Sequence, residues 1–277
     1  MKKCTYIIVG ILAMVILGGG IANYEKWQGE QISILQNNDK TRREEMDALN
    51  ADILELQNRL LALETGKVVE YDTNGYNYLA IGNSITTHAK CDYWWDERGM
   101  ASTSKENDYV HLVSLYLKEY YKIQVTHIVN YASWEVQSND RAETYELIDP
   151  YLSPEVDLLT VQLGENVNDL TMFSSDFEAL ILYLKSNCPN AEIMIIDDFW
   201  DNSDRRNIKQ SVAENCGVTY VDLSEIREKA EYECGLGTIV YGDDGEEHVV
   251  EHSGVAEHPG DAGMKYIADA IINQIQK

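Results

Sequence analysis

From residue 76 onward, short apolar runs alternate with stretches in which apolar residues recur every three or four positions. The short runs predict strands, and the periodic stretches predict amphipathic helices. Runs such as residues 193–196 are apolar on both faces, as the buried strands of a parallel sheet are. The predicted fold class is therefore α/β, a three-layer α/β/α sandwich around a five-stranded parallel sheet.

The predicted strands are residues 77–81, 124–129, 157–163, 192–196 and 218–222. The predicted helices between and after them are residues 108–121, 141–147, 174–187, 204–215 and 261–275. Residues 241–258 are rich in Gly, Glu and His, and this composition predicts a long loop. One domain over residues 76–277 accounts for all of these elements.

Residues 1–24 predict an N-terminal transmembrane anchor. No charged residue lies between Cys4 and Tyr24, and Lys2 and Lys3 precede this stretch. About 20 apolar residues can cross a bilayer, with the lysines on the cytoplasmic side. The rest of the chain is then expected outside the cytoplasm, on a cell membrane crossed once. Removal as a signal peptide is the competing interpretation, because Gly20-Ile21-Ala22 resembles a small-x-small cleavage site.

Residues 25–66 predict a helical stalk. Its apolar positions alternate spacings of three and four, as in a coiled coil; they are Met46, Leu49, Ile53, Leu56, Leu60 and Leu63. Two chains could form a homodimer through this seam. A single amphipathic helix lying on the following domain is the alternative, because about three heptads are marginal for an isolated dimer.

The composition and net charge limit the classes of partner and ligand to be expected. The chain has 277 residues, 44% of them hydrophobic, and a formal net charge of -25. Such a charge repels phosphate backbones and anionic lipid headgroups, so nucleic acid is not an expected partner. Beyond the anchor, Cys91, Cys188, Cys216 and Cys234 permit two disulfides or remain free thiols. They lack the CxxC spacing of zinc sites, and we expect neither a metal nor a cofactor.

Three polar motifs lie where strands end or where the last helix begins. Gly82-Asn83-Ser84 and Gly164-Glu165-Asn166 each follow an apolar run, and His258-Pro259 precedes the last helical stretch. In parallel sheets, sites form beyond the carboxyl ends of the strands. A serine hydroxyl becomes a nucleophile when a base takes its proton, and His258 is the candidate base for Ser84.

In order and approximate spacing, these motifs resemble the SGNH (GDSL-like) hydrolase family, over about residues 76–277. The resemblance implies a flavodoxin-like sheet and a serine esterase in which Ser84 attacks and His258 shuttles the proton. It also implies an oxyanion hole made of the Ser84 backbone N–H, the Asn166 side-chain amide and a backbone N–H after the second strand. The best alignment places Glu135 at this last position.

Two positions depart from the family pattern. Glu135 stands where the family commonly has glycine, and Val255 stands where it usually carries the catalytic Asp. A Ser-His dyad and an inactive relative are therefore both open. If the acid has moved, the candidates by proximity in the sequence are Glu251, Asp243 and Asp244.

Two further side chains are candidates for substrate binding. Trp134 could stack on a sugar ring or simply cover the core, and Asp197 could line a substrate pocket or remain a solvated loop acid. The function predicted is a membrane-anchored, extracytoplasmic serine esterase that removes O-acyl groups, such as O-acetyl, from a glycan. Acyl transfer would use the same residues. A non-catalytic module that binds glycan or protein is the alternative, and a metal site at His248 and His252 is a third, weaker one.

Overall fold

The computed structural model describes residues 69–137 and 140–275. The predictions for residues 1–24 and 25–66, a membrane anchor and a coiled-coil stalk, lie outside these residues. Within them, no helix is both long enough and apolar enough to cross a bilayer.

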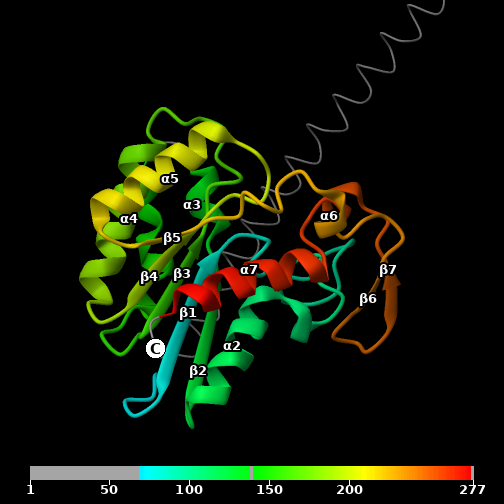
Figure 1. Cartoon of the computed structure of the whole chain (residues 1–277), viewed down its shortest axis with the longest axis horizontal. Helices are drawn as coiled ribbons and strands as arrows, with labels where there is room; N and C mark the ends of the chain where they lie inside the picture. Colours follow the sequence, from blue (N-terminus) through cyan, green and yellow to red (C-terminus); the bar gives the residue numbers. More distant parts are fainter. Residues whose placement is uncertain (1–68, 138–139, 276–277) are drawn as a thin grey trace, which may run out of the picture. The chain divides into compact units, whose positions relative to one another are not determined.

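Five parallel strands form the central sheet (Figure 1). They are β1 (Tyr76–Gly82), β2 (Gln124–Asn130), β3 (Leu158–Gln162), β4 (Glu192–Ile196) and β5 (Thr219–Val221), in the order β2-β1-β3-β4-β5. Because every pair is parallel, all five carboxyl ends lie at one edge of the sheet. At that edge, Gly82 pairs with Asn130 and with Gln162. The loops that follow β1, β2 and β3 therefore begin side by side.

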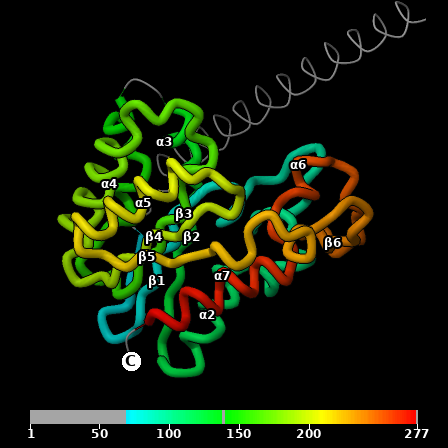
Figure 2. Tube along the Cα trace, turned by 45° about the horizontal axis from the view of Figure 1, so that its top comes forward, coloured from blue at the N-terminus to red at the C-terminus, as the bar shows by residue number. Residues whose placement is uncertain are grey.

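Helices cover both faces of the sheet. On one face, α2 (Tyr109–Tyr120) and α7 (Asp261–Gln274) lie next to each other, and on the other α4 (Phe173–Asn187) lies next to α5 (Ser203–Cys216) (Figure 2). The alternation of side chains along β1 explains both contacts. Tyr78 and Ala80 pack under α2 and α7, whereas Leu79 and Ile81 pack under α4 and α5. The predicted α/β sandwich with a five-stranded parallel sheet is confirmed.

The shorter elements differ more from the predictions. The predicted helix over residues 141–147 is the 3-10 helix η2 (Arg141–Leu147), and α3 (Ala132–Val136) directly after β2 was not predicted. The remaining 3-10 turns are η1 (Lys105–Asn107), η3 (Asp149–Tyr151) and η4 (Ala230–Tyr232).

The prediction of a loop over residues 241–258 is wrong in part. The segment contributes to an antiparallel hairpin of β6 (Ile239–Tyr241) and β7 (Glu247–Val249), and then forms α6 (Ser253–Ala256). Val240, Val250 and Val255 are buried there against Trp94, in a small core of their own. This core gives the segment a regular structure that its Gly-rich composition did not reveal.

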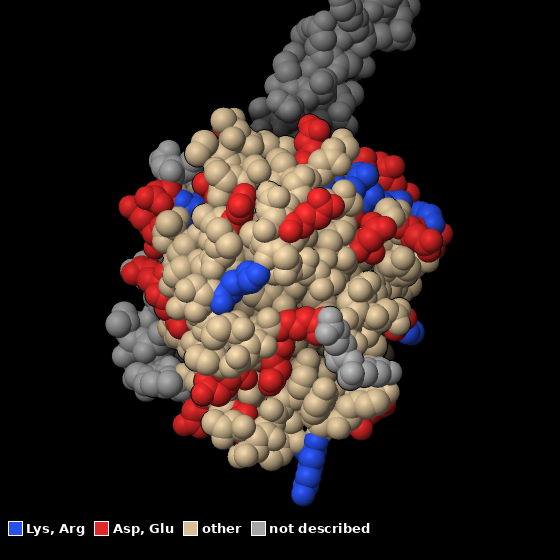
Figure 3. Space-filling model, turned by 60° about the vertical axis from the view of Figure 1, so that its left-hand side comes forward, with Lys and Arg blue, Asp and Glu red and all other residues tan. Residues whose placement is uncertain are grey.

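Charged side chains on the face in Figure 3 are mostly acidic, with few Lys or Arg among them. This agrees with the net charge of -25.

Candidate active site

Ser84 lies two residues beyond the end of β1, in a tight turn that Asn83 organises. The Asn83 Oδ1 accepts the Ile85 N–H (3.1 Å), and the Asn83 carbonyl accepts the Thr86 N–H (3.0 Å). A Cβ on Gly82 would lie 1.9 Å from the Thr86 Oγ1, so only glycine permits this turn. The turn leaves the Ser84 side chain partly exposed at the carboxyl edge of the sheet.

His258 approaches Ser84 from the segment between α6 and α7. Its Nε2 lies 2.8 Å from the Ser84 Oγ, although the two residues are 174 positions apart. The backbone of His258 is held on both sides, since its N–H donates to Val255 (3.1 Å) and its carbonyl accepts the Cys234 N–H (2.9 Å). The structure thus brings together the predicted nucleophile and the predicted base.

The other ring nitrogen of His258 settles the tautomer. Its Nδ1 lies 2.7 Å from the Gly254 carbonyl oxygen, and a carbonyl can only accept a hydrogen bond. The proton therefore resides on Nδ1, and the lone pair of Nε2 faces the Ser84 hydroxyl. Burial lowers the pKa of His258 from 6.5 to about 4; the Gly254 bond partly opposes this, and His88 and His252 lower the pKa further. At neutral pH the imidazole is ready to accept a proton.

The three candidates for a relocated acid are corrected by this geometry. The Gly254 carbonyl occupies the position where a carboxylate would hold the Nδ1–H. Asp243 pairs instead with Lys90 (2.6 Å) and Asp244 with His248 (3.0 Å), both at the tip of the β6–β7 hairpin. Glu251 is exposed just beyond β7.

Asn166, the predicted oxyanion donor, is held by the Glu135 side chain. Its Nδ2 donates to the Glu135 Oε2 at 2.6 Å. The Glu135 Oε1 accepts the Gly164 N–H, the Asn166 N–H (3.4 Å) and the Asn83 Nδ2 (3.2 Å). Only 2% of Glu135 is exposed, so this carboxyl group is a buried hub between the loops after β1, β2 and β3.

Glu135 is the fourth residue of α3, and its side chain reaches the site. That its backbone N–H faces the oxyanion stays a prediction. Among the described residues, no hydrogen bond engages the Ser84 N–H, which leaves this predicted donor available.

Behind Glu135 lies a buried network of charges. Asn83 Nδ2 also donates to the Glu165 Oε2 (2.8 Å), and burial and Asp198 raise the pKa of Glu165. Burial alone would raise the pKa of Asp198, but Lys209 (2.6 Å) and Arg205 (2.5 Å) lower it. Lys209 is wholly buried behind Gly164, where a Cβ would come within 2.8 Å of the Lys209 Cε.

Both candidates for substrate binding are corrected. Trp134 is 0% exposed and packs on Phe173 and Phe177, with the Arg141 guanidinium 5.2 Å from its ring centre. It covers the core, which was the alternative interpretation. Asp197 is also 0% exposed and pairs with Arg227, so it neither lines a pocket nor lies in solvent.

Other aromatic rings lie near His258. The Trp200 ring meets the imidazole edge to face, with centroids 4.9 Å apart, and is itself partly exposed. Tyr93 stacks on His252 at 4.2 Å, and Trp95 stacks on His248 at 4.4 Å. The two histidines thus lie against separate rings, and no group of three or more metal-ligating side chains occurs within the described ranges.

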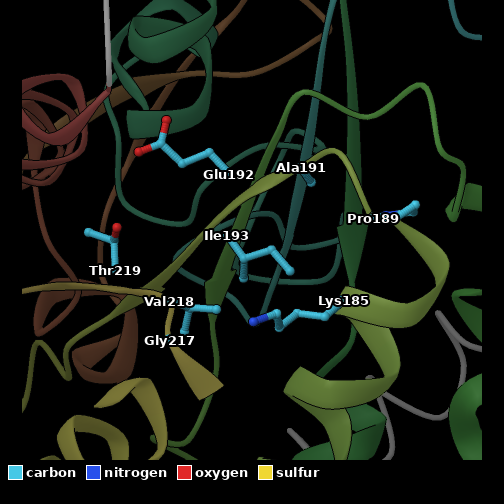
Figure 4. A pocket seen from close by; sticks show the side chains of 9 residues that line it. Lys185, Pro189, Ala191, Glu192, Ile193, Gly217, Val218 and Thr219 are labelled. Carbon is cyan, nitrogen blue, oxygen red and sulfur yellow. The ribbon is translucent and has the colours of Figure 1, made fainter. Parts of the chain in front are cut away.

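The predicted choice between disulfides and free thiols falls on free thiols among the described cysteines. Cys91, Cys188, Cys216 and Cys234 are all free thiols. Cys188 lines a hollow of about 430 Å³ at the amino ends of β4 and β5, the edge opposite Ser84. Figure 4 shows Lys185 reaching across it toward Gly217, where its Nζ donates to the Cys216 carbonyl.

Sequence reasoning missed three contributions to the site. Gly254 acts through its carbonyl, and no sequence signal distinguishes a carbonyl that faces a histidine. Lys209 occurs in a polar helical stretch, and such a pattern predicts a lysine exposed to solvent. One sequence signal pointed to Glu135: a glutamate stands where the family commonly has glycine.

A serine and a histidine are thus hydrogen-bonded at the carboxyl edge of a parallel α/β sheet, an arrangement in which a histidine can take the proton of a serine hydroxyl. No family model matches the chain, and no curated protein matches it. Solved structures do. A family two carbohydrate esterase from Clostridium thermocellum, in complex with cellohexaose, is 17% identical with a TM-score of 0.48, covering 72% of this chain and 63% of that one.

Phospholipase A1 from Streptomyces albidoflavus is 11% identical (TM-score 0.46), with 73% of this chain and 100% of that one covered. A GDSL-like lipase from Parabacteroides merdae is 15% identical (TM-score 0.44), with 75% and 98% covered. All three likenesses are distant, with TM-scores between 0.44 and 0.48. What the site can do chemically is derived from its own geometry.

Proposed function

We propose that the protein is a serine esterase of the SGNH type that works with a Ser-His dyad. One observation carries this proposal: the Ser84 Oγ lies 2.8 Å from the His258 Nε2, while the Gly254 carbonyl holds the Nδ1 of the same ring at 2.7 Å. The nucleophile, the base and the orientation of the base are all present.

In the reaction, the Ser84 oxygen attacks the carbonyl carbon of the ester while His258 takes the hydroxyl proton on Nε2. The tetrahedral intermediate collapses to an acyl-enzyme, and His258 returns the proton to the departing alcohol. Water then adds to the acyl group by the same route, His258 again taking and returning a proton, and the acid leaves. A second alcohol in place of water would give acyl transfer.

The developing oxyanion needs hydrogen-bond donors that already point at it. The Ser84 N–H supplies one. The Asn166 amide supplies the second through the hydrogen that Glu135 does not hold, since an NH₂ group carries two.

A Ser-His dyad stabilises the protonated histidine less than a Ser-His-Asp triad does. A backbone carbonyl orients the imidazole as a carboxylate would, but it carries only a partial charge and stabilises the imidazolium less. Proton transfer to His258 is therefore harder than in a Ser-His-Asp triad. A modest kcat follows from the geometry.

The substrate we propose is an O-acyl ester, such as an O-acetyl ester, on a glycan. The partly exposed Trp200 ring next to the base supports this choice, because such rings stack on the apolar faces of sugars. The acidic surface disfavours anionic lipid aggregates. The setting we propose is extracytoplasmic, with residues 1–24 as a membrane anchor and residues 25–66 as a coiled-coil stalk.

The test measures acetate release by the purified full chain from an O-acetylated oligosaccharide and from p-nitrophenyl acetate. Ser84→Ala should lower kcat at least about a thousandfold, and the matched variant Ser174→Ala, exposed on α4, should leave it unchanged. Hydrolysis that survives Ser84→Ala contradicts the proposal. Glycan binding without any turnover would point instead to the non-catalytic module.

A further inference from the structure

Glu135 is an unusual neighbour for an oxyanion hole. Its carboxyl group takes hydrogen bonds from the side chains of Asn83 and Asn166 and from the N–H groups of Gly164 and Asn166. Three of these four donors belong to the loop after β3. The carboxyl group therefore sets where this loop holds the Asn166 amide.

The charge of this carboxyl group opposes the reaction. An oxyanion bound to the second hydrogen of the Asn166 amide would lie about 5 Å from Glu135, since two hydrogen bonds share one nitrogen. A unit charge at that distance slows formation of the oxyanion by on the order of a hundredfold, at an effective dielectric constant of about 20. The site works best with this group neutral.

The surrounding charges favour the neutral form. In the part of the chain that the structure describes, no Lys or Arg pairs with Glu135. Glu165 faces Glu135 across the Asn83 amide and repels its charge. The nearest cations have carboxylate partners of their own: Lys209 and Arg205 pair with Asp198, which lies behind Glu165, and Arg141, which lies over the Trp134 ring of α3, pairs with Asp176.

The pKa of Glu135 is shifted in the direction that these surrounding charges favour. Burial and Glu165 raise it from 4.5 to about 7, against the hydrogen bonds from the Asn166 side chain, the Gly164 N–H and the Asn83 side chain, which lower it. Oε2 takes only one of those donors and so has room for the proton.

Resting on the esterase proposed above, we propose that Glu135 is a positioning residue whose protonated carboxyl group holds the Asn166 amide as an oxyanion donor. When Glu135 loses its proton, the donor stays in place but a negative charge faces the oxyanion. Hydrolysis then slows without a change in fold. Glu135 acts through Asn166 and does not touch the substrate.

The experiment follows kcat/KM for p-nitrophenyl acetate from pH 5 to 9 with the full chain, subtracting the rate of Ser84→Ala at each pH. The wild-type value should fall above about pH 7, by on the order of a hundredfold at pH 9. Glu135→Gln, which cannot ionise, should lose this alkaline decline. Glu143→Gln, an exposed match on η2, should keep it.

A second readout does not depend on turnover. In Ser84→Ala, the side-chain amide resonances of Asn166 should shift with a midpoint near pH 7, and adding Glu135→Gln should abolish that shift. Melting temperatures show whether each variant is folded; if Glu135→Gln is not, the titration in Ser84→Ala alone decides.

Two failures are distinguishable. Ser84-dependent hydrolysis with the same alkaline decline in Glu135→Gln, or an Asn166 amide that does not titrate, overturns the role of Glu135 and leaves the esterase standing. Absence of any Ser84-dependent hydrolysis overturns the esterase, and the role of Glu135 falls with it.

Discussion

Acidification should inactivate the proposed esterase only near pH 4, because the His258 imidazole stays unprotonated down to that pH. Burial lowers its pKa from 6.5 to about 4. The difference of about 2.5 pH units, at about 1.4 kcal/mol each, means that the folded protein disfavours the imidazolium by about 3 kcal/mol. His88 and His252 act in the same direction, and the Gly254 carbonyl acts against it.

The assay is kcat/KM for p-nitrophenyl acetate between pH 3.5 and 7. The acid limb should have its midpoint near pH 4 and a slope of one proton. Preincubation at each pH, followed by assay at pH 6, separates reversible protonation from denaturation.

A midpoint near 6.5 would refute this reasoning, since it would mean that water reaches the ring as freely as in an unfolded chain. The sign for stability follows from the same shift. The folded pKa lies below the unfolded one, so the stability contribution is complete above about pH 6.5 and is lost as the pH falls through about 4.

Three further outcomes are expected. Lys209→Met should lose about 3 kcal/mol of unfolding free energy in urea at pH 7, because Asp198 keeps its charge in a buried site with one partner fewer, whereas Lys118→Met, at an exposed position of α2, should lose little. The unfolding free energy of Glu135→Gln, relative to that of the wild type, should rise by up to about 3 kcal/mol as the pH increases from 4.5 to beyond 7, because the raised pKa of Glu135 makes the wild type lose stability over this range; a pH-independent difference would contradict this. Trp200→Ala should raise KM for an acetylated oligosaccharide at least about fivefold and leave p-nitrophenyl acetate hydrolysis nearly unchanged, and an equal effect on both substrates would exclude a sugar contact.

The sheet could be predicted from the sequence because its inner strands, β1, β3 and β4, are apolar and buried on both faces. β4 has the predicted bounds, Glu192–Ile196, and the other strands differ from theirs by one or two residues. In contrast, α3 has only five residues and the β6–β7 hairpin has strands of three, too short to show a period. These short elements depend on contacts such as the buried Trp94 cluster.

The residues of the site also separate into those that the sequence could predict and those that it could not. Ser84, Asn166 and His258 could be named because each follows or precedes a regular element with a local motif. The partners of Glu135 lie 29 to 52 residues away in the chain, and no local pattern predicts them. The sequence could not decide between the two interpretations of Trp134, and both interpretations of Asp197 were wrong, because burial depends on which distant segments cover a side chain.

By itself, the sequence determined the parallel sheet, the edge at which chemistry can occur and the serine and histidine that meet there, because local periodicity and parallel connections dictate these. Only the tertiary structure decided that the Gly254 carbonyl holds the Nδ1 of His258, and that a buried glutamate, Glu135, holds the amide of Asn166. The physical reason is the separation along the chain over which each kind of information acts. Hydrophobic periodicity acts over a few residues, whereas hydrogen bonds and buried charges depend on which distant segments the fold brings within about 3 Å.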